Sequence, residues 1–154
     1  MIIKKTGHRS DHKVAGGLDG PFTLDEVVVH SRLHHHKSVW VVMSVDGTKK
    51  TGHGMAAGAM DSAIIAISEI TGLNALVISL SVHVVANGND GSVSSAYCSM
   101  TVNGLSVVGH GHSADLVEAS VAAYVDGLNR YFYESLCCSP SDRGDSVSAK
   151  SDVN

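Results

Sequence analysis

The sequence predicts an α+β domain made of two copies of a βββα unit, related by pseudo-twofold symmetry, with two antiparallel sheets each covered by a helix. Three observations lead to this expectation. Apolar and polar residues alternate, as in half-buried strands, in two separate groups on either side of residue 75. A stretch with apolar residues at helical spacing follows each group. Asp46-Gly47 and Asn103-Gly104 are two-residue hairpin signals at matching places.

The first unit is expected to contain three strands and a helix. Residues 24–30 are rich in β-branched side chains and read as a strand, and residues 39–45 alternate as a second one. After the Asp46-Gly47 turn, residues 48–54 return as a third strand. A helix is predicted over 60–71, with Gly72 as its stop signal.

The second unit repeats the same order. Alternation predicts strands at 76–84 and 96–102, separated by a dense turn at 87–91, and the Asn103-Gly104 turn leads to a strand at 105–109. A second helix follows, with apolar residues from Leu116 to Phe132 on a broad face. The repeat period is expected to be near 54 residues, which aligns Gly58 with Gly111 and Asp61 with Asp115.

Length and composition favour one folded domain with polar ends. The 154 residues are 44% hydrophobic and 17% charged, as in a soluble globular protein. A (β/α)₈ barrel needs roughly 250 residues, so none fits here. We expect a flexible lead-in at 1–21, a folded part at 22–134, with repeats at about 22–74 and 75–134, and a disordered tail at 135–154.

Charge and cysteine content narrow the range of partners. A formal net charge of −4 and a pI of about 6.2 argue against nucleic acid and anionic membranes, which require a basic face. The sequence has no apolar run of membrane-spanning length and no secretory signal. Three cysteines, two of them adjacent, do not form a disulfide framework, so we expect a reducing cytoplasm.

Several segments resemble the C-terminal regulatory domain of the 2-isopropylmalate synthase and citramalate synthase family. The strongest is 109–130, with a Gly-x-Gly turn, a Ser/Thr-Asp pair, Glu-Ala-Ser and a Leu-Asn-Arg close. Segments 22–27, 58–63 and 81–84 match in the same order, so the resemblance covers about 22–132. It implies a homodimerising domain that binds leucine as the feedback effector of leucine biosynthesis, or isoleucine in the citramalate synthases, and it leaves open a catalytic barrel elsewhere as a partner.

The resemblance also implies where an amino acid binds, near the dimer interface and against the two glycine-containing helix entries. A helix N-terminus offers free N–H groups and a positive dipole end to a carboxylate. The implied effector-binding residues are Ala57, Gly58, Ala59, Met60 and Asp61 in the first entry, Ser113, Ala114, Asp115 and Leu116 in the second, and Ser81, His83 and Val84 on the facing strand.

Each of these residues also has a purely structural interpretation. Asp61 and Asp115 can serve only the helix dipole, Gly58 and Gly111 only the turns, and Met60 only the core. The family's usual Gly-Asn-Gly-Pro entry is replaced at 56–59 by Ala-Ala-Gly-Ala. A structural dimerisation domain that has lost its effector is therefore the alternative interpretation.

Ten histidines raise the question of a metal site. His34-His35-His36 lies in a predicted loop, and His110-Gly111-His112 with His53 lies near a helix entry. No Cys-x-x-Cys or His-Glu-x-x-His pattern accompanies them, so we expect neither metal nor cofactor. No nucleophile elbow is present, and Cys98 falls in mid-strand, so we expect no catalysis by the chain alone.

Overall fold

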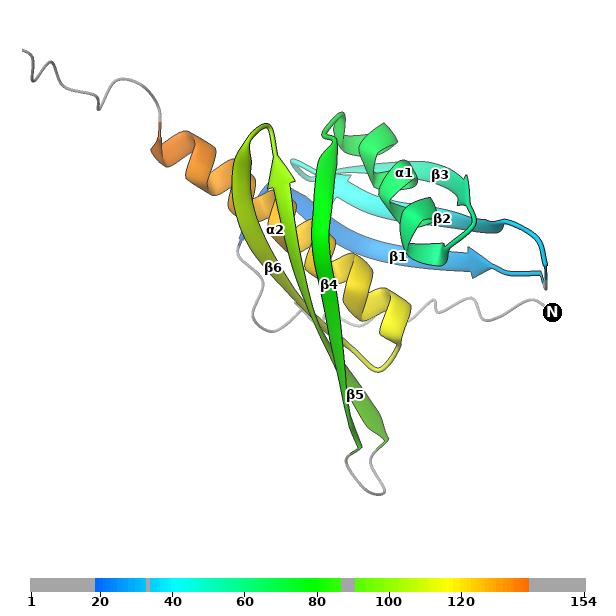
Figure 1. Cartoon of the computed structure of the whole chain (residues 1–154). Helices are drawn as coiled ribbons and strands as arrows, with labels where there is room; N and C mark the ends of the chain where they lie inside the picture. Colours follow the sequence, from blue (N-terminus) through cyan, green and yellow to red (C-terminus); the bar gives the residue numbers. More distant parts are fainter. Residues whose placement is uncertain (1–18, 33, 87–90, 139–154) are drawn as a thin grey trace, which may run out of the picture.

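The predicted duplicated βββα fold is confirmed by a computed structural model, which describes residues 19–32, 34–86 and 91–138 (Figure 1). The elements are β1 (Phe22–His30), β2 (Lys37–Val45), β3 (Thr48–Ala56), α1 (Ala59–Thr71), β4 (Ala75–Ala86), β5 (Ser92–Val102), β6 (Leu105–Ser113) and α2 (Leu116–Cys137). They form two antiparallel three-stranded sheets in the orders β1-β2-β3 and β4-β5-β6. The His34-His35-His36 run is exposed in the β1–β2 connection.

Both predicted hairpin turns are present and have the backbone that their sequences favour. Asp46 and Gly47 have φ values of 50° and 81°, and Asn103 and Gly104 have φ values of 47° and 84°. Positive φ at both central residues is the requirement of the type I′ turn that best fits the twist of paired strands.

The two units match more closely in space than the sequence predicted. Both first strands carry a bulge, between Leu24 and Glu26 in β1 and between Val77 and Ser79 in β4. These bulges correspond at a spacing of 53 residues, whereas all later elements correspond at a spacing of 57. The single period near 54 was therefore wrong, because the first hairpin of the second unit is four residues longer.

This longer hairpin changes which residues are equivalent. With a spacing of 57, Gly54 corresponds to Gly111, and the N-cap residue Gly58 corresponds to the N-cap residue Asp115. The predicted alignments of Gly58 with Gly111 and of Asp61 with Asp115 were out of register. In the structure Asp61 matches Glu118 in the first turn of the helix.

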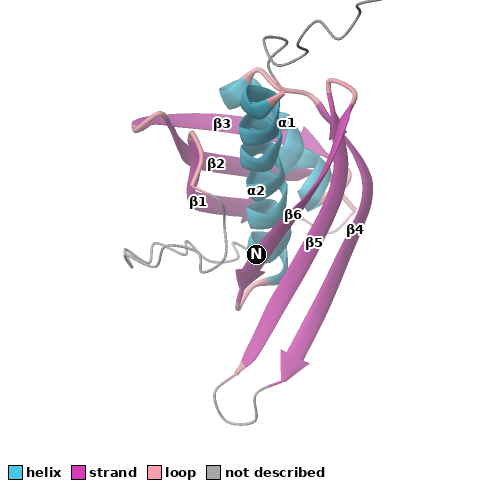
Figure 2. Ribbon diagram, turned by 90° about the vertical axis from the view of Figure 1, so that its left-hand side faces the viewer, coloured by secondary structure: helices cyan, strands magenta, loops and turns pink. Residues whose placement is uncertain are grey.

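Glycines in the last strand of each unit let the helix lie directly on the sheet. A Cβ atom built on Gly54 would overlap the carbonyl oxygen of Ser62 in α1, and one built on Gly111 would overlap that of Ala119 in α2. Under each helix the central strand presents a buried row: Val39, Val41 and Met43 in β2, and Ala96, Cys98, Met100 and Val102 in β5. Figure 2 shows the helices in the middle of the molecule, with one sheet on each side.

The two helices end differently. Gly72, in the left-handed conformation at φ 69°, ends α1 as predicted. The helix α2 continues past the predicted end near Phe132 to Cys137, beyond the predicted start of the tail. No helix in the described ranges is long and apolar enough to cross a membrane.

Candidate functional site

The start of α1 has no side chain that caps its free backbone N–H groups. Gly58 is the N-cap residue, with φ −109° and ψ 153°, and no side-chain hydrogen bond caps the helix there. The first N–H groups of a helix have no partner within the helix, so they depend on a cap, water or a ligand. The first intrahelical bond runs from Ser62 N to Gly58 O at 3.1 Å.

Ser62 fixes this entry to the neighbouring strand. Its hydroxyl is buried and lies 2.7 Å from the carbonyl oxygen of Gly58 and 3.0 Å from that of Lys37, at the start of β2. The entry therefore keeps a defined shape although no side chain caps it. Asp61 is exposed in the first turn, and its Oδ2 would lie 3.1 Å from a Cβ atom at position 58.

The start of α2 is closed by its own carboxylate. Asp115 Oδ1 accepts hydrogen bonds from the backbone N–H groups of Val117 at 2.8 Å and Glu118 at 3.0 Å. Ser113 Oγ accepts from Asp115 N at 3.1 Å and donates to Glu118 Oε2 at 2.7 Å. This arrangement satisfies the exposed donors of the helix in the manner of a capping box.

Compared at the spacing of 57 residues, α1 lacks the capping carboxylate that α2 has. The amides of Val117 and Glu118 correspond to those of Met60 and Asp61, and the carboxylate-bearing Asp115 corresponds to Gly58. The backbone at position 58 does not require glycine, because its φ is negative. A Cβ atom there would meet only the Asp61 carboxylate. The α1 entry therefore lacks the carboxylate that Asp115 supplies at the α2 entry.

The other predicted residues are distributed between two faces of the second sheet. Ser81 and His83 pair with Tyr97 and Ser95 on the face that points away from α2, and Val84 pairs with the buried Ser94 on the opposite face. Leu116 is exposed at the start of α2. A hydrogen bond joins Ser113 and Asp115 into one cluster, whereas Ser81 and His83 lie apart from it on the outer face of β4.

Sequence reasoning missed a pair of matching aromatic and histidine contacts. His53 stacks on Trp40 with ring centroids 4.3 Å apart, and His110 meets Tyr97 edge-on at 4.8 Å. The backbone N–H of each histidine donates to a carboxylate of the covering helix: His53 N to Glu69 Oε2, and His110 N to Oδ2 of the buried Asp126. The signal was the repeated Gly-His-Gly motif at 52–54 and 109–111.

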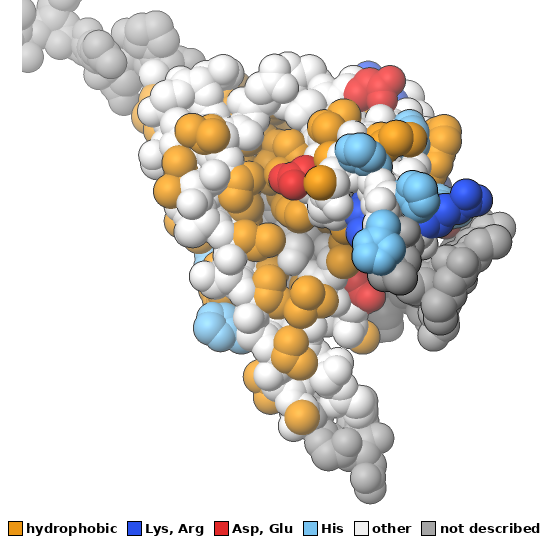
Figure 3. Space-filling model, turned by 45° about the vertical axis from the view of Figure 1, so that its right-hand side comes forward, with side chains coloured by type: hydrophobic (Ala, Val, Ile, Leu, Met, Phe, Trp, Pro, Cys, Tyr) orange, Lys and Arg blue, Asp and Glu red, His pale blue; other side chains and the backbone are white. Residues whose placement is uncertain are grey.

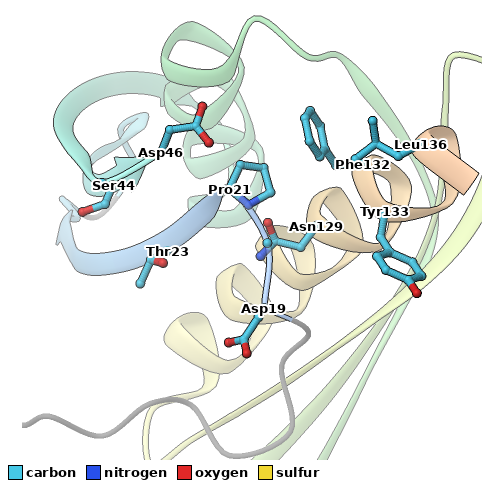
Figure 4. A pocket seen from close by; sticks show the side chains of 11 residues that line it. Asp19, Pro21, Thr23, Ser44, Asp46, Asn129, Phe132, Tyr133 and Leu136 are labelled. Atoms are coloured by element: carbon cyan, nitrogen blue, oxygen red, sulfur yellow. The ribbon is translucent and has the colours of Figure 1, made fainter.

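A hollow lies at the C-terminal half of α2 (Figure 4). It has a volume of about 430 Å³. Apolar side chains of α2, including Phe132 and Leu136, form one wall, and the β2–β3 hairpin with Ser44 and Asp46 forms another. None of the predicted effector-binding residues lines it. Within the described ranges, no three His, Cys, Asp or Glu side chains come together in a way that could hold a metal ion.

The fold and its two unequal helix entries define a small α+β domain with one uncapped and one self-capped helix. The family model of the LeuA allosteric (dimerisation) domain matches residues 10–132. The chain therefore belongs to the family of LeuA allosteric (dimerisation) domains.

Similar proteins include three 2-isopropylmalate synthases. The one from Ruthia magnifica subsp. Calyptogena magnifica is 37% identical over 90 residues, covering 58% of this chain and 17% of that protein. The one from Syntrophus aciditrophicus is 35% identical over 88 residues, covering 57% and 17%. The one from Pelotomaculum thermopropionicum is 30% identical over 115 residues, covering 74% and 23%. The chain thus spans about a fifth of the length of the curated relatives it matches.

Proposed function

We propose that this chain is the regulatory and dimerisation module of a 2-isopropylmalate-synthase-like enzyme of leucine biosynthesis in the cytoplasm. In this proposal it forms a homodimer, binds leucine as a feedback effector, and acts on a catalytic barrel located outside it rather than catalysing a reaction itself. The family match and the similar synthases support the class. The observation that carries the effector site is the uncapped start of α1 beside the self-capped start of α2.

The leucine carboxylate is proposed to bind the backbone N–H groups of Met60 and Asp61. Their counterparts in α2 hold the Asp115 carboxylate, which supports the fit of such a group at a helix entry of this shape. The Asp61 carboxylate is a suitable acceptor for the leucine ammonium group, and the Met60 side chain supplies apolar contact. The second entry is already occupied by its own side chain, so we propose one effector per chain.

The strand residues enter this proposal only with a second molecule present. Ser81 and His83 lie on a sheet face that no helix or strand among the described residues covers. An effector that contacts them needs a cover that the described part of the chain does not supply, and we propose that a second copy supplies it. The proposed effector pocket is therefore completed by a partner. Its remaining walls are Ala57 and Ala59 of the first entry and Ser81 and His83, and at its edge lie Val84, on the other face of the sheet, and Ala114 and Leu116 of the second entry.

Thermal unfolding with added amino acids tests the effector. A ligand that binds only the folded state raises stability by about 2.7 kcal/mol at a hundredfold excess over its Kd. For a domain of this size that corresponds to a rise in Tm of several degrees. Millimolar leucine should give a larger rise than valine or glycine. A larger shift with isoleucine would instead favour a citramalate-synthase type, and no shift with any of them would favour a structural dimerisation domain.

The variant Gly58→Asp tests the position of the site. It supplies α1 with the carboxylate that Asp115 gives α2, but it places this carboxylate beside that of Asp61. Because the two like charges repel, they offset much of the capping gain, and we expect the stability of the unliganded protein to change by less than about 1 kcal/mol. The same carboxylate would occupy the place of the ligand, so the leucine shift should disappear. Asp115→Ala is the matched control, which should cost about 1 kcal/mol in stability and retain the leucine shift. A leucine shift that survives Gly58→Asp unchanged would move the site elsewhere.

A further inference from the structure

The outer face of the second sheet carries no formal charge. We call this surface the open face, because α2 covers only the other side of the sheet (Figure 2). By strand alternation and register it consists of Leu76, Ser79, Ser81, His83 and Val85 in β4, Val93, Ser95, Tyr97, Ser99 and Thr101 in β5, and Ser106, Val108, His110 and His112 in β6. These fourteen positions include no Asp, Glu, Lys or Arg.

The first sheet provides an internal comparison. Its equivalent face carries Glu26 and Lys49, which correspond to Ser79 and Ser106 in the open face. At the bulge, Asp25 corresponds to Ile78. The same fold thus accepts charges at these positions in one unit and lacks them in the other, so folding alone does not explain the uncharged surface.

Large apolar side chains stand in solvent on this surface. Leu76 is 66% exposed, Val108 46% and Tyr97 40%. In Figure 3 hydrophobic and uncharged side chains extend toward the projecting β4–β5 hairpin, whereas Lys and Arg side chains gather on the other side of the view. Depletion of charge with an aromatic residue in the centre is the composition of the buried core of a protein interface.

The edge of this sheet is also unprotected. The twelve residues of β4 include no charged side chain, and β4 pairs with β5 on one side only. Edge strands are usually protected from association by a lysine, a proline or a covering segment. The sequence of β4 has neither lysine nor proline. The longer hairpin of the second unit also carries the paired Val85 and Val93, which are 55% and 40% exposed.

We propose that the open face is the surface through which a second copy of this chain docks, the two open faces packing against each other about a twofold axis. This inference rests on the proposed homodimer and specifies its interface. A second copy fits for three reasons. The chain belongs to a family of dimerisation domains. A surface without formal charge meets its own copy without like-charge repulsion. Tyr97 lies between the rings of His83 and His110, and the other positions around it, Ser79, Ser81, Ser95 and Ser99, carry small side chains, so an aromatic centre with a low surround is presented to the other copy.

The size of the open face suits such a contact. Three strands of 12, 11 and 9 residues cover about 14 Å across the strands and about 30–40 Å along them, without counting the side chains. A stable interface uses roughly 800 Å² of accessible surface per partner, which a face of this extent with its side chains can supply. The docking would also cover Ser81 and His83, as the proposed effector pocket requires.

Matched glutamate substitutions test the interface. Val108→Glu puts a carboxylate on the open face, and Ile65→Glu puts one on α1 at almost the same exposure, 46% against 47%. Burying two unpaired carboxylates in a twofold contact should raise the dimer dissociation constant of Val108→Glu at least about a hundredfold. Ile65→Glu should leave it unchanged. Sedimentation equilibrium over a range of protein concentrations measures these constants.

A second variant guards against loss of folding. Ser106→Lys introduces the charge that the first unit carries at the equivalent Lys49, so the fold accepts it, and it should weaken the dimer as well. Far-UV circular dichroism and Tm confirm that each variant is folded. Dimers of wild-type strength in both folded open-face variants would overturn the docking surface while leaving the dimer intact. Equal weakening by Ile65→Glu would also overturn it. A wild-type chain that stays monomeric at high concentration would overturn the proposed dimer itself.

Discussion

The side-chain amide of Asn129 in α2 makes two hydrogen bonds to the backbone of Phe22 at the start of β1. Phe22 N donates to Asn129 Oδ1 at 3.0 Å, and Asn129 Nδ2 donates to Phe22 O at 2.8 Å. Both residues are buried, and 107 positions separate them. The second unit thus supplies the partner for the first backbone groups of the first unit, which ties the two ends of the fold together.

We expect Asn129→Ala to destabilise the protein by about 2–4 kcal/mol, because it leaves a buried backbone donor and acceptor without partners. Urea unfolding followed by circular dichroism measures the change. Ser44→Ala is the control, because the hydrogen bond from its hydroxyl to Asp25 Oδ2 lies on the surface, and it should cost less than about 1 kcal/mol. Similar losses in the two variants would contradict the structural role assigned to Asn129.

The glycines at the helix–sheet contacts should differ sharply from the glycine at the α1 entry. In Gly54→Ala and Gly111→Ala the new methyl group would overlap backbone oxygen atoms of α1 and α2, so we expect losses of about 3 kcal/mol or more, or failure to fold. Gly58→Ala meets only the Asp61 side chain and has a compatible φ, so it should change stability by less than about 1 kcal/mol. The Tm values of the three variants decide the matter, and a large loss in Gly58→Ala would show that this glycine serves the fold.

Local patterns were sufficient to predict the order of elements. Alternation along β2 and β5 follows directly from a buried row facing a helix, and the Asp46-Gly47 and Asn103-Gly104 turns require little beyond their own residues. The exact repeat register was not predictable in this way. It depends on the length of the first hairpin in each unit. In the second unit this hairpin is four residues longer, and the turn residues do not indicate how long the strands beside them are.

The candidate site was predictable only in part, for a related reason. The sequence singled out both helix entries, but it paired Asp61 with Asp115 and so gave the two helices equal roles. Only the register shows that Asp115 caps α2 while Gly58 leaves α1 without a cap. The position of Ser81 and His83 on an uncovered face depends on which side of the sheet α2 occupies, and strand alternation alone does not specify that side.

The three cysteines should react very differently with thiol reagents. Cys98 is buried in β5, and burial raises its pKa from 9.0 to about 11, whereas Cys137 and Cys138 are exposed at the end of α2. Because the thiolate is the reactive form, Cys98 should stay unmodified at pH 8 in the folded protein. Ellman's reagent should therefore find two fast thiols in native protein and three after unfolding in urea. A third fast thiol in the native state would show that β5 opens readily.

Alkaline pH should destabilise the fold through the same burial. Burial also raises the pKa of the Tyr124 hydroxyl, which lies near Ser68 and the Ala75 backbone without completing a hydrogen bond. A pKa that is higher in the folded state means that the folded protein holds its proton more tightly than the unfolded chain does. The stabilisation is therefore complete below the unfolded pKa and is lost as pH rises through the folded one.

For Cys98 this loss falls between about pH 9 and pH 11, and it amounts to about 2–3 kcal/mol for a shift of this size. For Tyr124 it begins near pH 10 and continues upward.

Urea unfolding from pH 8 to pH 11 should show a falling free energy of unfolding. Cys98→Ala should flatten the first part of that fall, even though the cavity it leaves lowers the free energy of unfolding at pH 8. Tyr124→Phe should flatten the later part and cost little at pH 8, because it removes a buried hydroxyl that has no partner. Cys137→Ala is the matched control and should leave the whole profile unchanged, since that thiol is exposed. A profile that keeps its full slope in both Cys98→Ala and Tyr124→Phe would place the alkaline sensitivity in other groups.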